Sequence, residues 1–135
     1  MSKPAACLGD KLIAVDIHIV MVPSAGKPVP TPLPHPFSGT ILGDVSPNVM
    51  INGKPAATLG STAQNQPPHT PTSPGISFQK QPTNQGKILM GSATVLINGK
   101  PAARLGDLGL TCNDPADLPA GRVMVTHPRT VLIGD

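Results

Sequence analysis

A repeated segment of fourteen residues limits what this chain can fold into more than any other feature. Residues 48–61 (NVMINGKPAATLGS) return at 94–107 as TVLINGKPAARLGD. A third copy is divided between the chain ends: residues 3–10 (KPAACLGD) match its second half, and residues 130–135 (TVLIGD) resemble its first half. If the two ends complete one unit, the N- and C-termini lie together and the three units close into a pseudo-threefold ring.

Each copy has the sequence of a tight β-hairpin. Val-Met-Ile and Val-Leu-Ile favour strands, and Asn-Gly directly after them is a strong hairpin signal, since both turn positions require positive φ. A single hairpin is marginally stable in water, whereas three packed hairpins share a core. No segment shows a sustained helical period free of Pro and Gly. The sequence therefore predicts an all-β fold, a small cone of three pseudo-threefold hairpins in a single domain over residues 1–135.

Two long inserts separate the copies. Residues 23–39 are rich in proline, and we expect them to be an extended, polyproline-like loop. Residues 61–86 are polar, and both inserts are long enough to need something that holds them down. The chain has 18 Pro, 14 Gly, two Phe, no Trp and no Tyr, so its core must be a thin one of aliphatic side chains.

Composition and motifs argue against several functions. The formal net charge is only +3, no Lys/Arg-rich run occurs, and few aromatic rings are available to stack on bases, so nucleic-acid binding is not expected. Neither Gly-x-Ser-x-Gly nor His-Glu-x-x-His occurs, so we expect no catalytic site. Asp114 and Asp117, on either side of Pro115, indicate a turn, with a bound cation as the alternative. No signal peptide or membrane span is visible, so we expect synthesis in the cytoplasm.

The end of the repeat carries a family resemblance. Residues 100–107 (KPAARLGD) contain Pro-Ala-Ala-Arg, and the other copies have Pro-Ala-Ala-Cys at 4–7 and Pro-Ala-Ala-Thr at 55–58. This pattern resembles the motif that names the PAAR-repeat proteins, over essentially the whole chain. The resemblance implies a cone on the blunt end of a trimeric, β-helical spike of the VgrG type, with one chain per trimer. Such spikes arm type VI secretion systems, contractile phage tails and extracellular tail-like particles.

The same resemblance implies how such a chain would work. A PAAR-type tip sharpens and caps the spike, leaves the cell with it and touches the target membrane transiently while puncturing it. A separate effector is a further expected partner. We expect the contact with the spike on the strands of the two complete repeats, through apolar contact and edge pairing, at Val49, Ile51, Val95 and Ile97.

Members of the family bind one structural zinc near the apex through histidine and cysteine. The resemblance places this zinc on His18, His35, His69 and Cys112. A zinc would also offset the thin core, because a structural zinc contributes directly to folding free energy. Four protein ligands leave no position for water, whereas three ligands would support the alternative function, a small zinc-dependent hydrolase with an open metal site.

Each proposed ligand also has a simpler interpretation. His18 lies between two isoleucines and fits a core or edge-strand position, and His35 and His69 fit exposed, proline-flanked loops. Cys112 fits a small buried hydrophobe. His127 directly precedes the terminal strand, so we expect it at the surface, with replacement of one of the four ligands as the alternative.

Overall fold

The computed structural model describes residues 2–135 as a chain of short and long β-strands. No helix occurs among these residues, so the expected all-β class is confirmed. Likewise, none of them forms a helix long and apolar enough to cross a membrane. In chain order the strands are β1 (Lys3–Pro4), β2 (Lys11–Ser24), β3 (Lys27–Gly43), β4 (Met50–Ile51), β5 (Lys54–Pro55), β6 (Thr62–Asn65), β7 (Ser77–Phe78), β8 (Gln85–Ile88), β9 (Leu96–Ile97), β10 (Lys100–Pro101), β11 (Leu108–Thr111), β12 (Leu118–Met124) and β13 (Leu132–Ile133).

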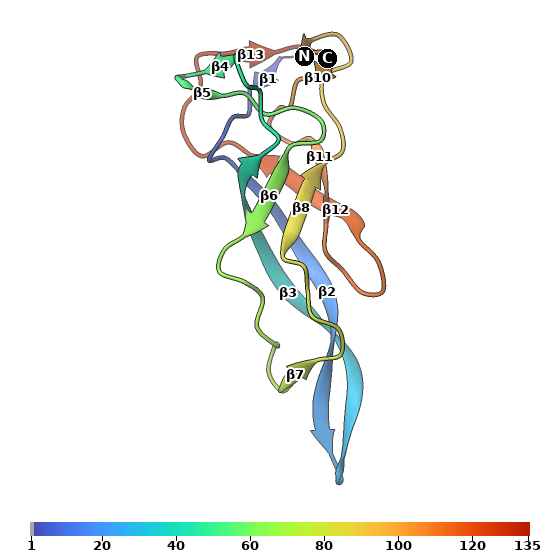
Figure 1. Cartoon of the computed structure of the whole chain (residues 1–135). Helices are drawn as coiled ribbons and strands as arrows, with labels where there is room; N and C mark the ends of the chain where they lie inside the picture. Colours follow the sequence, from blue (N-terminus) through green and yellow to red (C-terminus); the bar gives the residue numbers. More distant parts are fainter. Residues whose placement is uncertain (1) are drawn as a thin grey trace.

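Three two-stranded sheets form the broad end of the molecule (Figure 1). β4 pairs with β5 and β9 with β10. The turn residues Asn52 and Asn98 have φ of 50° and 52°, and each is followed by a glycine with positive φ, as an Asn-Gly hairpin turn requires. β1 pairs with β13, with Lys3 opposite Ile133. The divided repeat is thus completed by the two chain ends, and the termini lie together as predicted (Figure 1).

A closed cycle of backbone hydrogen bonds joins the three copies. The N–H of Ala6 donates to the carbonyl of Ala103, that of Ala103 to Ala57, and that of Ala57 to Ala6, each at 3.0 Å. All three alanines are buried. Because three chain segments meet at this point, a small side chain is favoured in the second alanine position of each repeat.

Below the hairpins the main sheet closes on itself. Its strands follow the order β12-β11-β8-β6-β3-β2, and β12 also pairs with β2. Leu12 and Phe37 fill the interior, and glycines face them. A Cβ on Gly109 would lie 2.3 Å from Leu12 Cδ1, and one on Gly86 would lie 2.7 Å from Leu12 Cδ2. The barrel is therefore narrow, and its core is as thin as the composition predicts.

β2 and β3 extend beyond the barrel as one long hairpin that forms the narrow end (Figure 1). Their register runs from Lys11 opposite Thr40 to Ser24 opposite Lys27. The first insert was expected to be a polyproline-like loop, and this expectation is wrong: it lies almost entirely within these two paired strands. The taper comes from this hairpin, and the repeat hairpins form the broad end instead of the expected cone.

The spacing of the prolines explains why the insert can be a strand. The N–H groups of Ile17 and Ile19 point away from β3, toward side chains of Asn113 and Asp114. Even-numbered residues of β2 therefore exchange hydrogen bonds with odd-numbered residues of β3. The prolines of β3 are all even-numbered, at positions 28, 30, 32, 34 and 36. Their missing donors fall on the outer edge of β3, where a strand tolerates proline.

The second insert is partly structured as well. It contributes β6, β7 and the start of β8, and it leaves a loop at 66–76 between the first two. Asn84 holds the loop, since its Oδ1 accepts the N–H of His69 at 2.8 Å and its carbonyl accepts the N–H of Asn65 at 2.8 Å. β7 pairs with β2 at Val20 and Met21. The loop is thereby held at both ends, by Asn84 at its start and by the pairing of β7 with β2 at its end.

Candidate metal centre

Because side chains alternate along β2, two polar side chains of this strand point into the interior of the molecule. Leu12 and Ala14 face the barrel core, and the next two inward residues are Asp16 and His18, both buried. Val20 continues the same inward row toward the narrow end. Carboxylate and imidazole thus occupy positions that would otherwise extend the apolar core.

Four buried side chains converge at this level: Asp16, His18, His69 and Cys112. Cys112 Sγ lies 3.6 Å from His18 Nε2 and 3.4 Å from Asp16 Oδ2. Asp16 Oδ2 lies 2.9 Å from His69 Nε2 and 4.0 Å from His18 Nε2. Ligands of one tetrahedral zinc would be about 3.3 Å apart for two N or O atoms and about 3.5 Å apart for S and N. The cluster has the dimensions and the donor types of a metal site.

The charges in the cluster also call for a cation. No lysine or arginine among residues 2–135 forms an ion pair with Asp16; its carboxylate is approached by Thr111 Oγ1 at 2.6 Å and by Asn113 Nδ2 at 3.4 Å. Burial and the nearby Asp16 raise the pKa of the Cys112 thiol to about 11. Burial lowers the pKa of His18, which favours the neutral imidazole that binds metals. A divalent cation would compensate for the Asp16 carboxylate and would favour the thiolate form of Cys112, and these four residues could hold one.

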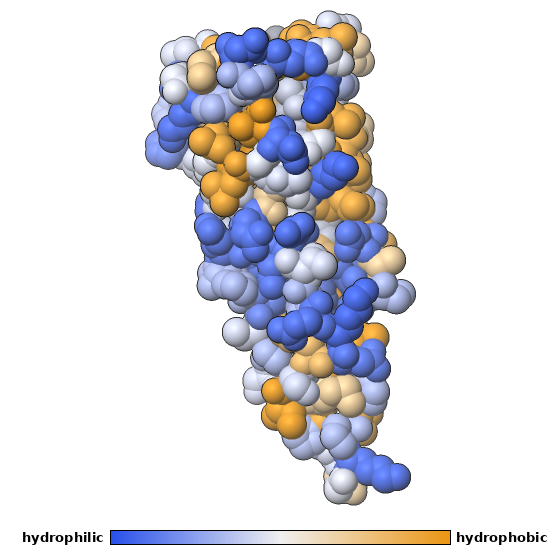
Figure 2. Space-filling model, viewed as in Figure 1, coloured by the Kyte–Doolittle hydropathy of each residue, from blue (hydrophilic) through white to orange (hydrophobic). Residues whose placement is uncertain are grey.

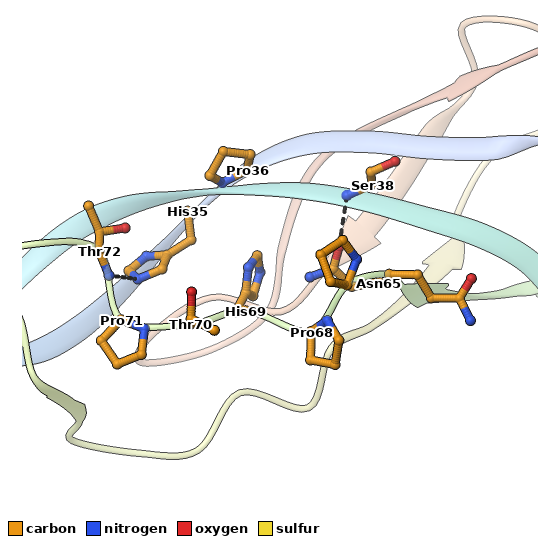
Figure 3. Close-up of a pocket in the computed structure, with 11 residues that line it drawn as sticks. His35, Pro36, Ser38, Asn65, Pro68, His69, Thr70, Pro71 and Thr72 are labelled. Carbon is orange, nitrogen blue, oxygen red and sulfur yellow. Dashed lines mark hydrogen bonds between the residues drawn. The ribbon is translucent and has the colours of Figure 1, made fainter.

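His35 lies beside this cluster. Its ring centroid is 5.5 Å from those of His18 and His69, which are 5.0 Å from each other. Three imidazoles on one zinc would have centroids roughly 5 Å apart. Both ring nitrogens of His35 have other partners here: Nδ1 donates to the carbonyl of Leu33 at 2.8 Å, and Nε2 accepts the N–H of Thr72 at 3.1 Å (Figure 3).

Different elements bring the candidate ligands together. β2 supplies Asp16 and His18, the loop after β6 supplies His69, and Cys112 directly follows β11. A pocket lined by the 66–72 loop and by His35 opens beside the site (Figure 3). On another side, the ring of Phe78 lies 5.4 Å from that of His35 and 6.0 Å from that of His18. A metal bound here would tie the long hairpin to two shorter segments and keep the narrow end together.

One comparison with known protein families finds a match in the second half of the chain. The family model of the PAAR motif matches residues 78–135, which include the last complete repeat and the first half of the divided one. This match supports a PAAR-repeat protein. No match was found among curated proteins or among solved structures. Proteins with this motif are structural parts of spikes and not enzymes.

Sequence reasoning found three members of the cluster and missed the fourth. His18, His69 and Cys112 converge as expected, whereas Asp16 was not considered. Asp16 and His18 are two residues apart on one strand, so they share a face, and this spacing was the signal that could have found it. His127 is exposed and makes a 3.0 Å contact with Thr126 Oγ1, and it does not belong to the cluster.

The expected spike-contact residues differ in accessibility. Ile51 and Ile97 are 5% and 8% exposed and belong to the core of the broad end, and Val49 and Val95 pack against the same core. Strand alternation instead turns the residues between them outward: Met50, Leu96 and, in the divided copy, Leu132. These short strands use one face to build the thin core, so the side chains of the two isoleucines are not available for apolar contact with a partner.

Proposed function

We propose that this PAAR-repeat chain caps and sharpens the trimeric spike of a contractile injection system, with its hairpin end on the spike and its β2–β3 turn leading. One observation carries the proposal: the same outward position in the three copies holds Met50, Leu96 and Leu132, which are 54%, 61% and 59% exposed. Figure 2 shows the body narrowing away from this end. Three similar apolar side chains, one in each copy of the repeat, suit three identical subunits of a partner.

In this proposal the partner is a VgrG-type β-helical trimer that binds one chain. The narrow end makes the transient contact with the target membrane, and an effector carried on the tip would be a separate protein. Repetition of a unit within one chain supports the stoichiometry, because a single chain can then offer each spike subunit a comparable surface. Export together with the spike follows from the same assembly.

The test is binding to a trimeric VgrG-type spike, with the assembly weighed by native mass spectrometry. We expect one chain per trimer, and loss of the complex in a chain carrying Met50→Glu, Leu96→Glu and Leu132→Glu. Val15→Glu is the matched control, since Val15 is 60% exposed and lies in β2, outside the repeat hairpins. Binding at three chains per trimer, or an equal loss of binding from Val15→Glu, would contradict the proposed face.

We further propose that the buried cluster binds one structural Zn²⁺ through His18, His69 and Cys112. Thiolate and imidazole donors in tetrahedral spacing favour zinc. The hydrolase alternative needs a water in the fourth position, whereas Asp16 already lies beside the three proposed ligands as a further donor. No specific observation favours that alternative.

Two residues compete for the fourth position on the zinc. In the described conformation the Asp16 carboxylate lies close enough to the other three side chains to be the fourth ligand. His35 could take this position only after losing the hydrogen bond that its Nε2 accepts from the N–H of Thr72. Absorption spectra of the Co²⁺-substituted protein distinguish the two residues. Of the variants Asp16→Asn and His35→Ala, the one that removes a metal ligand will change the ligand-field absorption. The variant that leaves this absorption unaltered identifies the side chain outside the coordination sphere.

A further inference from the structure

The side of His18 that faces away from the cluster has an unusual environment. Its Nε2 is directed to the candidate metal position, 3.6 Å from Cys112 Sγ. Its Nδ1 is buried and has no hydrogen-bond partner within the described residues. The nearest acceptor is Asp114, whose Oδ2 lies 3.5 Å from this nitrogen and whose side chain is also buried. A buried ring nitrogen and a buried carboxylate thus face each other with only a small gap.

Asp114 is fixed in this position by the strand that carries His18. Its N–H donates to the carbonyl of Ile17 at 2.8 Å, and its Oδ2 accepts the N–H of Ile19 at 2.8 Å. These two bonds lie on either side of His18 along β2. The carboxylate therefore keeps its place relative to the imidazole, whatever occupies the cluster.

We propose that Asp114 is a positioning residue for the metal centre: it accepts the Nδ1–H of His18 and so leaves the Nε2 lone pair directed at the metal. This inference rests on the proposed metal site and adds to it a residue outside the coordination sphere. A ligating histidine commonly donates its second ring N–H to a carboxylate or carbonyl, which fixes the tautomer and the ring orientation and increases ligand basicity. The gap closes by a small rotation of the ring when Nε2 binds.

The neighbours of Asp114 on the chain act in the same way on a second member of the cluster. Thr111 Oγ1 and Asn113 Nδ2 both donate to Asp16 Oδ1, at 2.6 and 3.4 Å. Cys112 lies between them and faces the cluster itself. Residues 111–114 thus combine one candidate ligand with three side chains that orient others. The turn predicted around Pro115 therefore also serves the candidate metal site.

The test compares Asp114→Asn and Asp114→Ala with the wild-type chain and with Asp117→Asn, an exposed aspartate in the same turn. Zn²⁺ affinity is measured by competition with a chromophoric chelator. Loss of an outer carboxylate typically weakens metal binding by about 10- to 100-fold. We expect Asp114→Ala to fall in this range, Asp114→Asn to lie between it and wild type, and Asp117→Asn to bind as wild type does.

A second measurement separates this role from the metal proposal. In metal-free wild-type protein, ¹⁵N NMR of the histidine rings is expected to show His18 protonated at Nδ1, and in Asp114→Ala this preference disappears. Protonation at Nε2 in the wild type, or unchanged Zn²⁺ affinity in Asp114→Ala, would overturn the role of Asp114. If the wild type binds no Zn²⁺, the proposed metal site fails. Asp114→Asn guards against a folding artefact, because its amide oxygen can still accept the N–H of Ile19.

Discussion

At the scale of single residues, the turn that ends each copy of the repeat, at Asp10, Ser61 and Asp107, is stabilised in three different ways. Arg104 stands three residues before Asp107, and their side chains form a buried ion pair at 2.9 Å. The corresponding residues in the second copy are Thr58 and Ser61, where the Thr58 N–H donates to Ser61 Oγ at 2.9 Å and no charge is present. The backbone-to-side-chain bond is common to both turns, because Arg104 N–H also donates to Asp107, at 2.7 Å.

The divided copy obtains its arginine from elsewhere in the chain. Cys7 stands in the arginine position, its N–H donates to Asp10 at 2.8 Å, and Arg129 forms the buried ion pair with Asp10. Arg129 also donates to the carbonyl of Ala5 and to Cys7 Sγ, both at 3.1 Å. A residue near the C-terminus thus completes a turn at the N-terminus and supports the contact between the chain ends.

Removing this arginine should destabilise the protein markedly. Arg129→Ala leaves the buried Asp10 carboxylate without its partner, which typically costs about 3–5 kcal/mol. Adding Cys7→Arg to that variant reproduces the arrangement of Arg104 and Asp107 and should recover a large part of the loss. Urea unfolding of the single and double variants measures both effects. An Arg129→Ala chain as stable as wild type would show that the ion pair contributes nothing.

Asp16 should affect stability in opposite directions with and without metal. In metal-free protein, Asp16→Asn removes a buried charge that no lysine or arginine among residues 2–135 pairs with, so the free energy of unfolding should rise by about 1 kcal/mol or more. In the presence of excess Zn²⁺, the same variant should be less stable than wild type, since it loses an anionic group beside the cation. Thermal unfolding with chelator and with Zn²⁺ gives the two signs. The same sign in both conditions would contradict a metal at this cluster.

At the scale of elements, the repeats could be predicted from sequence and the long hairpin could not. Asn-Gly after a short β-favouring run located the two complete hairpins, because the turn chemistry is local. The β2–β3 hairpin turns at Ala25-Gly26, which carries no such signal, although both residues have positive φ. The proline-rich insert was mistaken for a loop because proline was considered without its spacing. Only the pairing with β2 makes that spacing meaningful.

The β2–β3 turn offers a direct stabilising change. Ala25 has φ of 40°, a conformation that costs a non-glycine residue roughly 1 kcal/mol, whereas asparagine tolerates it. Ala25→Asn should therefore stabilise the hairpin by about 0.5–1 kcal/mol, seen as slower amide hydrogen exchange next to the turn. Ser24→Asn, one position earlier, is the control and should have no such effect. Faster exchange in Ala25→Asn would show that the turn has a different requirement.

Metal removal should loosen one half of the molecule and leave the other intact. The cluster joins β2 to the loop that carries His69 and to Cys112, whereas the broad end is held by its own apolar core and by the hydrogen-bond cycle of the alanines. On chelation, hydrogen exchange is expected to accelerate in residues 66–78 and to stay slow at Ala6, Ala57 and Ala103. Uniform acceleration over the whole chain would indicate that the two halves unfold together.

At the scale of the whole molecule, the chain is a column of layers. The apolar core of the broad end is followed by the alanine cycle, the narrow barrel around Leu12 and Phe37, the polar cluster and finally the paired strands of the narrow end. Sequence reasoning recovered the closed ring from the divided repeat, and the resemblance supplied most of the cluster. Sequence reasoning did not predict the barrel, because the barrel closes through pairing between β12 and β2, which no local sequence pattern reveals.

The central proposal is that the buried cluster, which could hold a metal ion, binds one structural Zn²⁺. The direct measurement is elemental analysis of the chain purified without chelators, with metal quantified per mole of protein. The account predicts one Zn²⁺ per chain, lost in Cys112→Ser and retained in Cys7→Ser, since Cys7 belongs to the core of the broad end. A folded wild-type chain without bound metal, or Zn²⁺ retained in full by Cys112→Ser, would contradict it.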